Sequence, residues 1–258
     1  MQMPLSIVVL VKHVYDEGQL KVDAATGLVS LQGVPGKVST FDRNALEAAL
    51  RLKQKFGGTV TTLTLGSEEA NKSIREALAM GVDNAFLVRT DDLLKLDSRQ
   101  VVEGLAGGLS KMPKWDIVMC AEGSTDVYSS VIPAMLAEKL DVPYLSYLRS
   151  IELEGQTLKG DRSLEKRVVT VECELPAVVS VVSEIYEPRI PTLLQIMAAM
   201  KKQITTFDFR DMNVEGEARY SLEGMFAKAV DRKKVMFEGS PSEVASKLVD
   251  SMAKEGLI

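Results

Sequence analysis

The sequence has few of the residues that build most metal and catalytic centres. Its 258 residues include one histidine, His13, and two cysteines, Cys120 and Cys173. The cysteines form no Cys-x-x-Cys pair, so Cys and His side chains cannot assemble a zinc site. Each cysteine lies in an apolar run, which is typical of buried thiols in a reducing compartment. Without a second histidine or a nucleophile elbow, hydrolytic and acyl-transfer catalysis is disfavoured.

Two further absences concern nucleic acids and membranes. The net charge is -5, and a mildly acidic chain has no general attraction to nucleic acid or to anionic membranes. No apolar run approaches the roughly 18 residues of a membrane helix. The first residues lack the basic and apolar regions of a secretory leader. We therefore expect a cytoplasmic protein with no nucleic-acid partner and no direct membrane insertion.

The glycine-rich motifs that bind phosphates in many enzymes are also absent. No Gly-x-x-x-x-Gly-Lys-Ser/Thr segment occurs, and no Gly-x-Gly-x-x-Gly segment follows a predicted strand. What the chain does have is 46% hydrophobic and 26% charged residues, the usual balance of a soluble globular protein. Its length suits one large domain, or one domain with appendages.

The first half of the chain alternates predicted strands and helices. Apolar, β-branched runs predict buried strands at residues 6–11, 59–65, 85–88 and 117–121. Helical spacing, caps at Asp42 and Ser67, and a helix start at Ser98 predict helices at 43–56, 67–80, 98–109 and 129–140. This pattern predicts an α/β fold, an open and mostly parallel sheet with helices on both faces. A β-hairpin insertion is expected at residues 20–31.

After Pro143 the pattern changes. Strands are predicted at 145–153, 157–162 and 167–182, followed by a short helix at about 192–201. Residues 204–239 have a weak pattern and indicate an extended C-terminal arm. Ser240-Pro241-Ser242-Glu243 then combines a capping box with proline at the first helical position, which predicts a terminal helix. Such an arm either drapes over the body or reaches a partner chain, and the sequence leaves both open.

The turn after the fourth predicted strand, residues 121–130, is the first candidate binding site. It offers small residues, several hydroxyls and the free N–H groups of a helix N-terminus, which suit a phosphate. Ligands of open α/β sheets bind beyond the carboxyl ends of the strands. The alternative is an ordinary helix cap, in which Ser and Thr are common.

Three other segments are weaker candidates. In residues 11–16, Lys12 could contact an anion and His13 or Tyr15 could stack on a ring, or these side chains could be merely solvated and packed. Residues 39–42 precede a predicted helix and could also hold a nucleotide. The aliphatic residues after Arg189 form either an exposed patch or part of the core.

Taken together, several stretches resemble one protein family. They are Leu-Val-Lys-His-Val at 10–14, the helical pair 44–53 and 74–83, and the segments 175–180, 187–193 and 196–202. Ala-Leu-Ala-Met-Gly at 77–81 and Leu-Pro-Ala-Val-Val followed by Glu-Pro-Arg resemble signature segments of electron-transfer flavoprotein beta subunits, including FixA-type chains. The resemblance runs in order from about residue 6 to 205.

This resemblance implies an electron carrier subunit and no enzyme. In the family, an alpha subunit holds the redox-active FAD, and the beta subunit packs against it and binds AMP. Electrons pass from acyl-CoA or other dehydrogenases to a quinone oxidoreductase or similar acceptor. In bifurcating members, the AMP site holds a second FAD, which makes the complex NADH-oxidising. The resemblance implies an adenine-nucleotide-binding α/β domain at 1–205, and an arm and helix at 206–258 that contact the alpha subunit.

The resemblance also assigns residues. A partner-docking loop spans about 183–202, with Leu193 as its apolar anchor and Arg189 at its base. Bifurcating members tend to have glycine where Val127 stands, and Val127 restricts the backbone near a phosphate, which favours AMP. No metal site is implied. The nucleotide contacts carry over to Leu10, Ser39, Thr40, Phe41, Asp42, Leu65, Ala121, Glu122, Gly123, Ser124, Thr125, Asp126, Val127, Tyr128, Ser129, Ser130, Val131 and Ile132.

Overall fold

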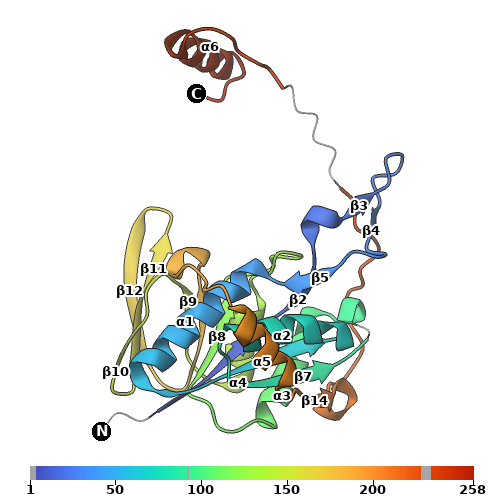
Figure 1. Ribbon diagram of the computed structural model, residues 1–258, viewed down its shortest axis with the longest axis vertical. Coiled ribbons are helices and arrows are strands. Elements are labelled where there is room, and N and C mark those ends of the chain that lie inside the picture. Colours follow the sequence, from blue (N-terminus) through green and yellow to red (C-terminus); the bar gives the residue numbers. More distant parts are fainter. Residues whose placement is uncertain (1–3, 92, 228–233) are drawn as a thin grey trace.

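The computed structural model describes residues 4–91, 93–227 and 234–258. These residues form a mostly parallel sheet with helices on both faces, which confirms the predicted α/β fold (Figure 1). In order of pairing, the main sheet contains β10 (Glu152–Glu154), β11 (Thr157–Leu164), β9 (Tyr144–Leu148), β13 (Ala177–Val181), β8 (Ile117–Ala121), β1 (Leu5–Leu10), β6 (Gly58–Gly66), β7 (Asn84–Arg89) and β14 (Thr205–Asp208), with β12 (Arg167–Glu174) beside β11.

The central strands are parallel and buried on both faces. β1 pairs in parallel with β6 and β8, and β8 pairs in parallel with β13. Every residue of β8 and β13 is buried. Apolar, β-branched runs suit such strands, because both faces of a parallel sheet are covered. The pairing places the carboxyl ends of β1, β6 and β8 at one edge of the sheet.

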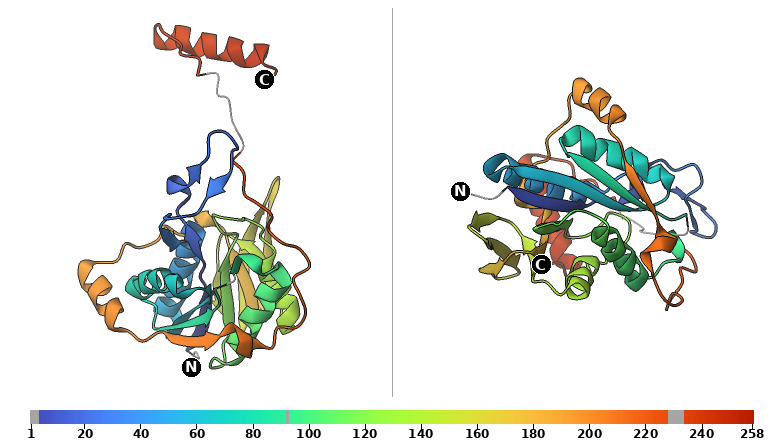
Figure 2. Two further views of the ribbon diagram at one scale, coloured as in Figure 1. Left: turned by 90° about the vertical axis from the view of Figure 1, so that its right-hand side faces the viewer. Right: turned by 90° about the horizontal axis from the view of Figure 1, so that it is seen from below.

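Helices cover the two faces in pairs. The helices are α1 (Thr40–Phe56), α2 (Asn71–Met80), α3 (Ser98–Ser110), α4 (Ile132–Leu140), α5 (Leu193–Lys201) and α6 (Pro241–Lys254). Ile7 and Val9 of β1 share one apolar cluster with α1 and α2, whereas Val8 shares the other with α3 and α4. This division follows from the alternation of side chains along a strand. Figure 2 shows the two pairs on opposite sides of the sheet, with α5 beyond α2.

Helix starts differ from the predicted caps in two places. Helix α1 begins at Thr40, so Asp42 lies in its first turn and is no cap. Ser67 makes no capping bond and precedes a 3-10 turn, Glu68–Ala70. Helix α3 begins at Ser98, as predicted, and Asp97 caps it in a capping box with Gln100.

Helix α4 starts at Ile132, three residues after the predicted start at Ser129. Tyr128 and Ser130 have φ angles of 48° and 57°. These left-handed conformations cannot continue into a right-handed helix. Residues 122–131 therefore form an irregular connection between β8 and α4, called here the β8–α4 turn.

The predicted strands of the second half are shorter than expected. The run 145–153 divides into β9 and β10, and the run 167–182 divides into β12 and β13 around Pro176. Proline cannot donate to a ladder, which accounts for the second break. Strand β11 agrees with the predicted strand at 157–162, and it forms an antiparallel hairpin with β12. Strand β14 was missed, because it lies in the segment expected to be an extended arm.

Two small sheets complete the described fold. β2 (His13–Tyr15) pairs with β5 (Gly36–Val38), and β3 (Lys21–Val22) pairs with β4 (Val29–Ser30), which confirms the hairpin insertion. Short 3-10 turns lie at Glu17–Gln19, Leu93–Lys95, Ser183–Ile185 and Phe209–Met212.

The predicted arm is partly draped over the body. Phe226 forms a bridge with Leu28, and Val29 donates a backbone hydrogen bond to Met225. Residues 228–233 of the predicted arm lie outside the described residues. Helix α6 has the predicted capping box, contains no buried residue and stands apart from the sheet (Figure 1). None of the described helices is long and apolar enough to cross a bilayer.

Candidate functional site

A cavity of about 380 Å³ lies at the carboxyl ends of β1, β6 and β8. Leu10, Leu65 and Ala121, at or next to the last positions of these strands, line it. This is the edge at which open α/β sheets bind ligands. The volume falls within the roughly 300–1,000 Å³ of small-molecule sites.

The cavity has an apolar wall and a polar wall. The polar wall is the β8–α4 turn. The apolar wall comes from the 3-10 turn after β7 and from α3, and residues of the C-terminal arm also line the cavity. The residues from these three segments are Leu93, Leu94, Leu96, Val101, Leu105, Tyr220, Ser221 and Leu222. The sequence analysis singled out none of them, although the run Leu93–Leu96 follows a predicted strand and so offered a signal.

The structure brings many of the expected nucleotide contacts to this cavity. Those that line it are Leu10, Asp42, Leu65, Ala121, Gly123, Ser124, Asp126, Val127, Ser129, Ser130 and Ile132. Those outside the lining are Ser39, Thr40, Phe41, Glu122, Thr125, Tyr128 and Val131. Ser39 is buried, Thr40 and Val131 are exposed, and Glu122 accepts a hydrogen bond from the Ser183 N–H. Their role as ligand contacts stays a prediction.

An ion pair joins the two sides of the cavity. Lys12, two residues beyond the end of β1, places its Nζ 2.7 Å from Asp126 Oδ2 in the β8–α4 turn. Ser124 Oγ and the Val127 N–H donate to Asp126 Oδ1 over 2.6 and 2.8 Å. Burial raises the pKa of Asp126, but the Lys12 charge and these hydrogen bonds outweigh it and hold the pKa below its ordinary value. Asp126 is therefore ionised at neutral pH.

Asp42 lies at the inner end of the cavity. Its side chain is buried, and Oδ2 accepts the backbone N–H of Lys12 over 2.6 Å. Burial raises the pKa of Asp42 from 3.8 to about 8, although the hydrogen bond and the charge of Lys12 lower it. At neutral pH the carboxyl group is mostly protonated, so the cavity holds a single full negative charge, on Asp126. Burial also raises the pKa of the adjacent Cys120 thiol, which stays neutral.

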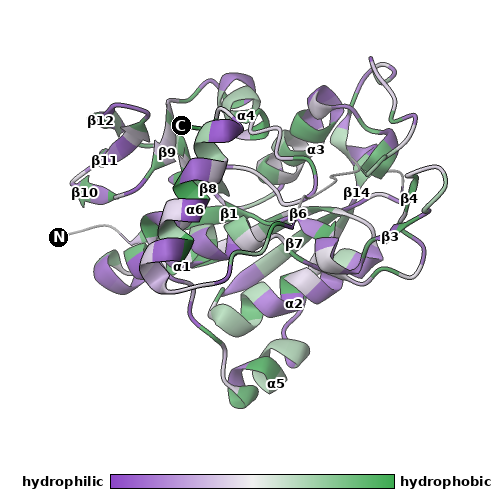
Figure 3. Cartoon of the chain, turned by 90° about the horizontal axis from the view of Figure 1, so that it is seen from above, coloured by the Kyte–Doolittle hydropathy of each residue, from purple (hydrophilic) through white to green (hydrophobic). Residues whose placement is uncertain are grey.

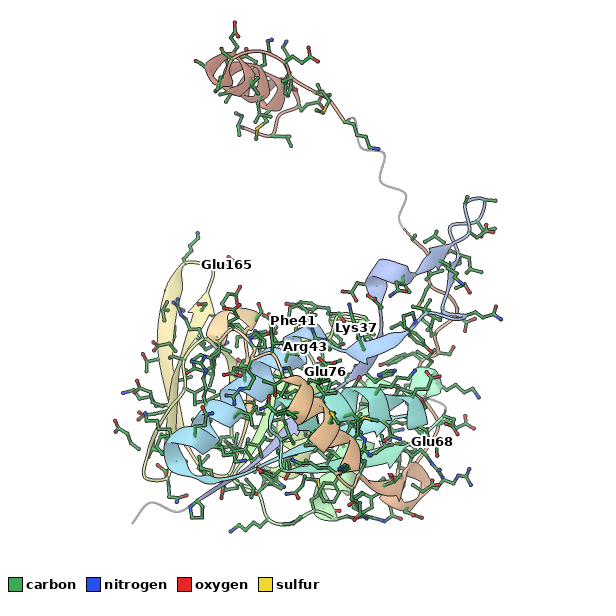
Figure 4. The ribbon with its side chains drawn as sticks, in the orientation of Figure 1. Lys37, Phe41, Arg43, Glu68, Glu76 and Glu165 are labelled. Atoms are coloured by element: carbon green, nitrogen blue, oxygen red, sulfur yellow. The ribbon has the colours of Figure 1, made fainter. Side chains whose placement is uncertain are left out.

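The backbone of the β8–α4 turn is fixed by its own contacts. Tyr128 donates its N–H to the Ser124 carbonyl over 3.0 Å, and its ring lies 5.4 Å from that of Phe41 on α1. Figure 4 shows Phe41 at the start of that helix. A Cβ at Gly123 would lie 2.8 Å from the Tyr128 ring, so a larger residue there would displace that ring. These contacts define the positions of the N–H groups and hydroxyls of the turn.

A second distinctive region is the α5 segment, residues 183–202. Its base is tied to α1 by a buried carboxylate: Glu47, with 3% of its side chain exposed, lies 2.6 Å from Arg189 Nε. Arg189 also donates its backbone N–H and Nη2 to Glu47, and Arg51 Nε donates over 2.8 Å. Asn44 Nδ2 donates to the carbonyls of Ser183 and Tyr186. Arg189 therefore lies where the α5 segment meets α1, and its role at the base of a partner-docking loop stays a prediction.

The outer face of the α5 segment is apolar and exposed. Leu193 is 72% exposed, which corrects the alternative that these aliphatic residues belong to the core. The other exposed apolar side chains of the segment are Ile190, Leu194, Ile196, Met197 and Met200. Figure 3 shows α5 projecting from the body beyond α2 with hydrophobic residues on it. Exposed apolar clusters of this kind mark interaction sites.

The fold and these two regions define a class of protein. It is an α/β fold with a cavity at the carboxyl edge of a mostly parallel sheet and a separate, exposed apolar projection. Residues 26–212 match the electron transfer flavoprotein domain family.

Three curated relatives are named as subunits of electron transfer flavoproteins or of an Etf complex. An electron transfer flavoprotein subunit beta of Thermoanaerobacterium thermosaccharolyticum is 30% identical over 98% of this chain and 100% of its own length. The corresponding subunit of Mycobacterium leprae is 36% identical over 81% of each chain. The caffeyl-CoA reductase-Etf complex subunit CarD of Acetobacterium woodii is 32% identical over 83% of this chain and 82% of its own length.

The chain belongs to the electron transfer flavoprotein family and is similar to its beta subunits over nearly its whole length. The resemblance found in the sequence is thereby confirmed. Members of this family are flavin-dependent electron carriers, and their beta subunits pair with an alpha subunit.

Proposed function

We propose that this chain is the beta subunit of a heterodimeric electron-transfer flavoprotein and holds AMP in the cavity at the carboxyl edge of its sheet. The alpha subunit holds the redox-active FAD, and this chain packs against the alpha subunit. The observation that carries the proposal is the cavity itself, in which strand ends, the β8–α4 turn and an apolar wall meet.

AMP suits the residues of this cavity. Leu65, Leu93 and Leu105 offer an apolar surface for the flat adenine ring. The hydroxyls of Ser129 and Ser130 and the N-terminus of α4 lie at the other side, and a helix N-terminus favours a phosphate group. The role of AMP is structural, because no group in the cavity is placed for chemistry on the nucleotide.

Two surfaces serve partners in this proposal. Acyl-CoA or other dehydrogenases dock on the α5 segment, where Leu193 supplies apolar contact and the bonds from Arg189 to Glu47 fix the base. The arm and helix of residues 206–258 contact the alpha subunit, which is supported by the lack of any buried residue in α6. A quinone oxidoreductase or similar acceptor takes the electrons, and the complex works in the cytoplasm.

Counting the bound cofactors tests the proposal. The chain is co-expressed with its alpha subunit, the purified complex is denatured, and released FAD and AMP are quantified by chromatography. One FAD and one AMP per heterodimer are expected. Two FAD and no AMP would replace the proposal by its alternative, a bifurcating complex with a second FAD in this chain. A complex that contains no flavin and accepts no electrons would refute both.

A pair of variants tests whether AMP binds in this cavity. Ser129 lies in the lining, so Ser129→Trp should fill the cavity and reduce the AMP recovered with the complex. Ser110, which is exposed at the end of α3 and outside the cavity, gives the matched control Ser110→Trp. Equal AMP recovery from both variants would place the nucleotide elsewhere.

A further inference from the structure

Lys12 is the only cationic residue among the described residues that line the cavity. Its Nζ lies 2.9 Å from Asp126 Oδ1, 2.7 Å from Asp126 Oδ2 and 3.5 Å from Ser124 Oγ. The Lys12 side chain is 34% exposed and the Asp126 side chain 32% exposed. The ammonium group is thus held at the cavity and remains accessible from it.

The backbone around Lys12 is fixed on both sides. Its N–H donates to Asp42 Oδ2 over 2.6 Å, and its carbonyl accepts the Ser39 N–H over 3.1 Å. Both partners lie at the start of α1, so the beginning of that helix sets where Lys12 leaves β1. From there the side chain crosses to the β8–α4 turn, which is more than 100 residues away in the chain.

The charges of the cavity allow an anion, because Lys12 offsets Asp126 and leaves no net negative charge to repel it. An ammonium group has three protons to donate, and Asp126 and Ser124 occupy two directions. The buried Asp42 carboxyl is mostly protonated at neutral pH, so Asp126 is the single carboxylate beside Lys12. A pair as exposed as Lys12 and Asp126 contributes little to folding stability. Its place in the cavity is therefore better accounted for by ligand binding than by stability.

We propose that Lys12 binds the phosphate group of the nucleotide, and that Asp126 and Ser124 are positioning residues that hold its ammonium group toward the β8–α4 turn. The inference rests on the proposed function and extends it by naming the residue that recognises a phosphate monoester. Adenosine, which lacks the phosphate, does not use this contact.

The experiment compares AMP with adenosine. The complex with the alpha subunit is unfolded and refolded without nucleotide, and binding of each ligand is measured by calorimetry. Lys12→Met should weaken AMP binding by about 10- to 100-fold, as expected for the loss of a charged hydrogen bond, and should change adenosine binding less than about twofold. Lys12→Arg, which keeps the charge, should restore most of the AMP binding.

Two further variants test the positioning role and the specificity of the effect. Asp126→Asn should weaken AMP binding several-fold, and the double variant should bind AMP no more weakly than Lys12→Met alone. Lys37 is the matched control, because its Nζ pairs with Asp16 and Glu17 outside the cavity at 27% side-chain exposure. Lys37→Met should leave both affinities unchanged.

Each contrary result has a distinct meaning. Equal losses of AMP and adenosine binding in Lys12→Met, or an unchanged AMP affinity, would overturn the phosphate contact. Tighter AMP binding in Asp126→Asn would show that Asp126 competes with the phosphate and would overturn its positioning role. If the unaltered complex binds neither ligand, the proposed AMP site itself fails, which is a separate outcome.

Discussion

The cavity and the α5 segment are constructed in opposite ways. The cavity is a concave site whose charged groups, Lys12 and Asp126, come from the segments that follow β1 and β8. The α5 segment is a projection whose charged contacts, Arg189 with Glu47, lie at the base. Its exposed surface is apolar instead, with Leu193 at 72% exposure.

In the two regions, different groups are responsible for the stability of the fold and for the proposed function. In the α5 segment, the outer side chains can change without affecting the fold, whereas the buried carboxylate at the base cannot. In the cavity, the functional groups are a lysine, hydroxyls and backbone N–H groups, so the backbone of the β8–α4 turn matters as much as any side chain. The predictions below test this separation.

The largest effect at constant pH is expected at Glu47. Glu47→Ala leaves Arg189 and Arg51 without their carboxylate, and loss of a buried charged partner is strongly destabilising. Because both arginines are partly exposed and can be hydrated, we expect a loss of about 1–3 kcal/mol in the free energy of unfolding. Urea unfolding of the complex measures it. Electron transfer from the dehydrogenase should fall as well, because the α5 segment loses its base.

Glu68 provides the control for Glu47. It pairs with Arg89 over 3.1 Å on the surface, with 72% of its side chain exposed (Figure 4). Glu68→Ala should change the free energy of unfolding by less than about 1 kcal/mol. Similar losses from both variants would show that the buried anchor is no more important than a surface pair.

The second effect concerns pH and Asp42. Its pKa is 3.8 in an ordinary environment and about 8 in the fold, so the folded protein holds this proton more tightly. The resulting stabilisation is complete below pH 4 and is lost as the pH rises through 8, at up to about 1.4 kcal/mol per pH unit. Urea unfolding at pH 5, 7 and 9 should therefore show the wild-type chain losing stability relative to Asp42→Asn.

Asp16 serves as the comparison for Asp42. Hydrogen bonds from Lys37, Gln19 and Gly18 lower the pKa of Asp16, so it is ionised in both folded and unfolded chains above pH 5. The stability difference between the wild-type chain and Asp16→Asn should stay constant from pH 5 to 9. A similar constancy for Asp42→Asn would contradict a protonated carboxyl in the cavity.

A smaller effect, on function alone, is expected at Leu193. Leu193→Ser should leave the free energy of unfolding within about 0.5 kcal/mol, because an exposed side chain has few contacts to lose. Electron transfer from the partner dehydrogenase should fall about tenfold, equivalent to about 1.4 kcal/mol of docking energy. Val168→Ser, at a 53% exposed position of β12, should change neither. Unaltered transfer in Leu193→Ser would place docking elsewhere.

The sequence was sufficient for the parallel part of the fold, for a physical reason. Strands such as β1 and β8 are buried on both faces, so their apolar runs are continuous and bounded by polar residues. Strand β14 was missed because it lies at the edge of the sheet, where partial exposure weakens the apolar pattern. The start of α4 was misplaced because positive φ at Tyr128 and Ser130 depends on contacts within the turn.

The candidate site was predictable only in part. The β8–α4 turn could be located, because ligands of parallel sheets bind where strands end. The family resemblance supplied Leu10, Asp42 and Leu65, which the structure brings to the same cavity. The contact between Lys12 and Asp126 joins residues 114 positions apart, and no local pattern records such a pairing.

The smallest effects compare the two ends of α4. Ser130, before the helix, and Asp141, after it, have φ angles of 57° and 53°. Glycine accepts this conformation without strain, so Ser130→Gly and Asp141→Gly should each change the free energy of unfolding by no more than about 1 kcal/mol, in the stabilising direction. Urea unfolding measures this change. AMP affinity should distinguish them, because Ser130 lines the cavity and Asp141 does not. Weaker AMP binding in Ser130→Gly alone would mean that the hydroxyl contributes to the site, whereas equal affinities would mean that the backbone of the turn suffices.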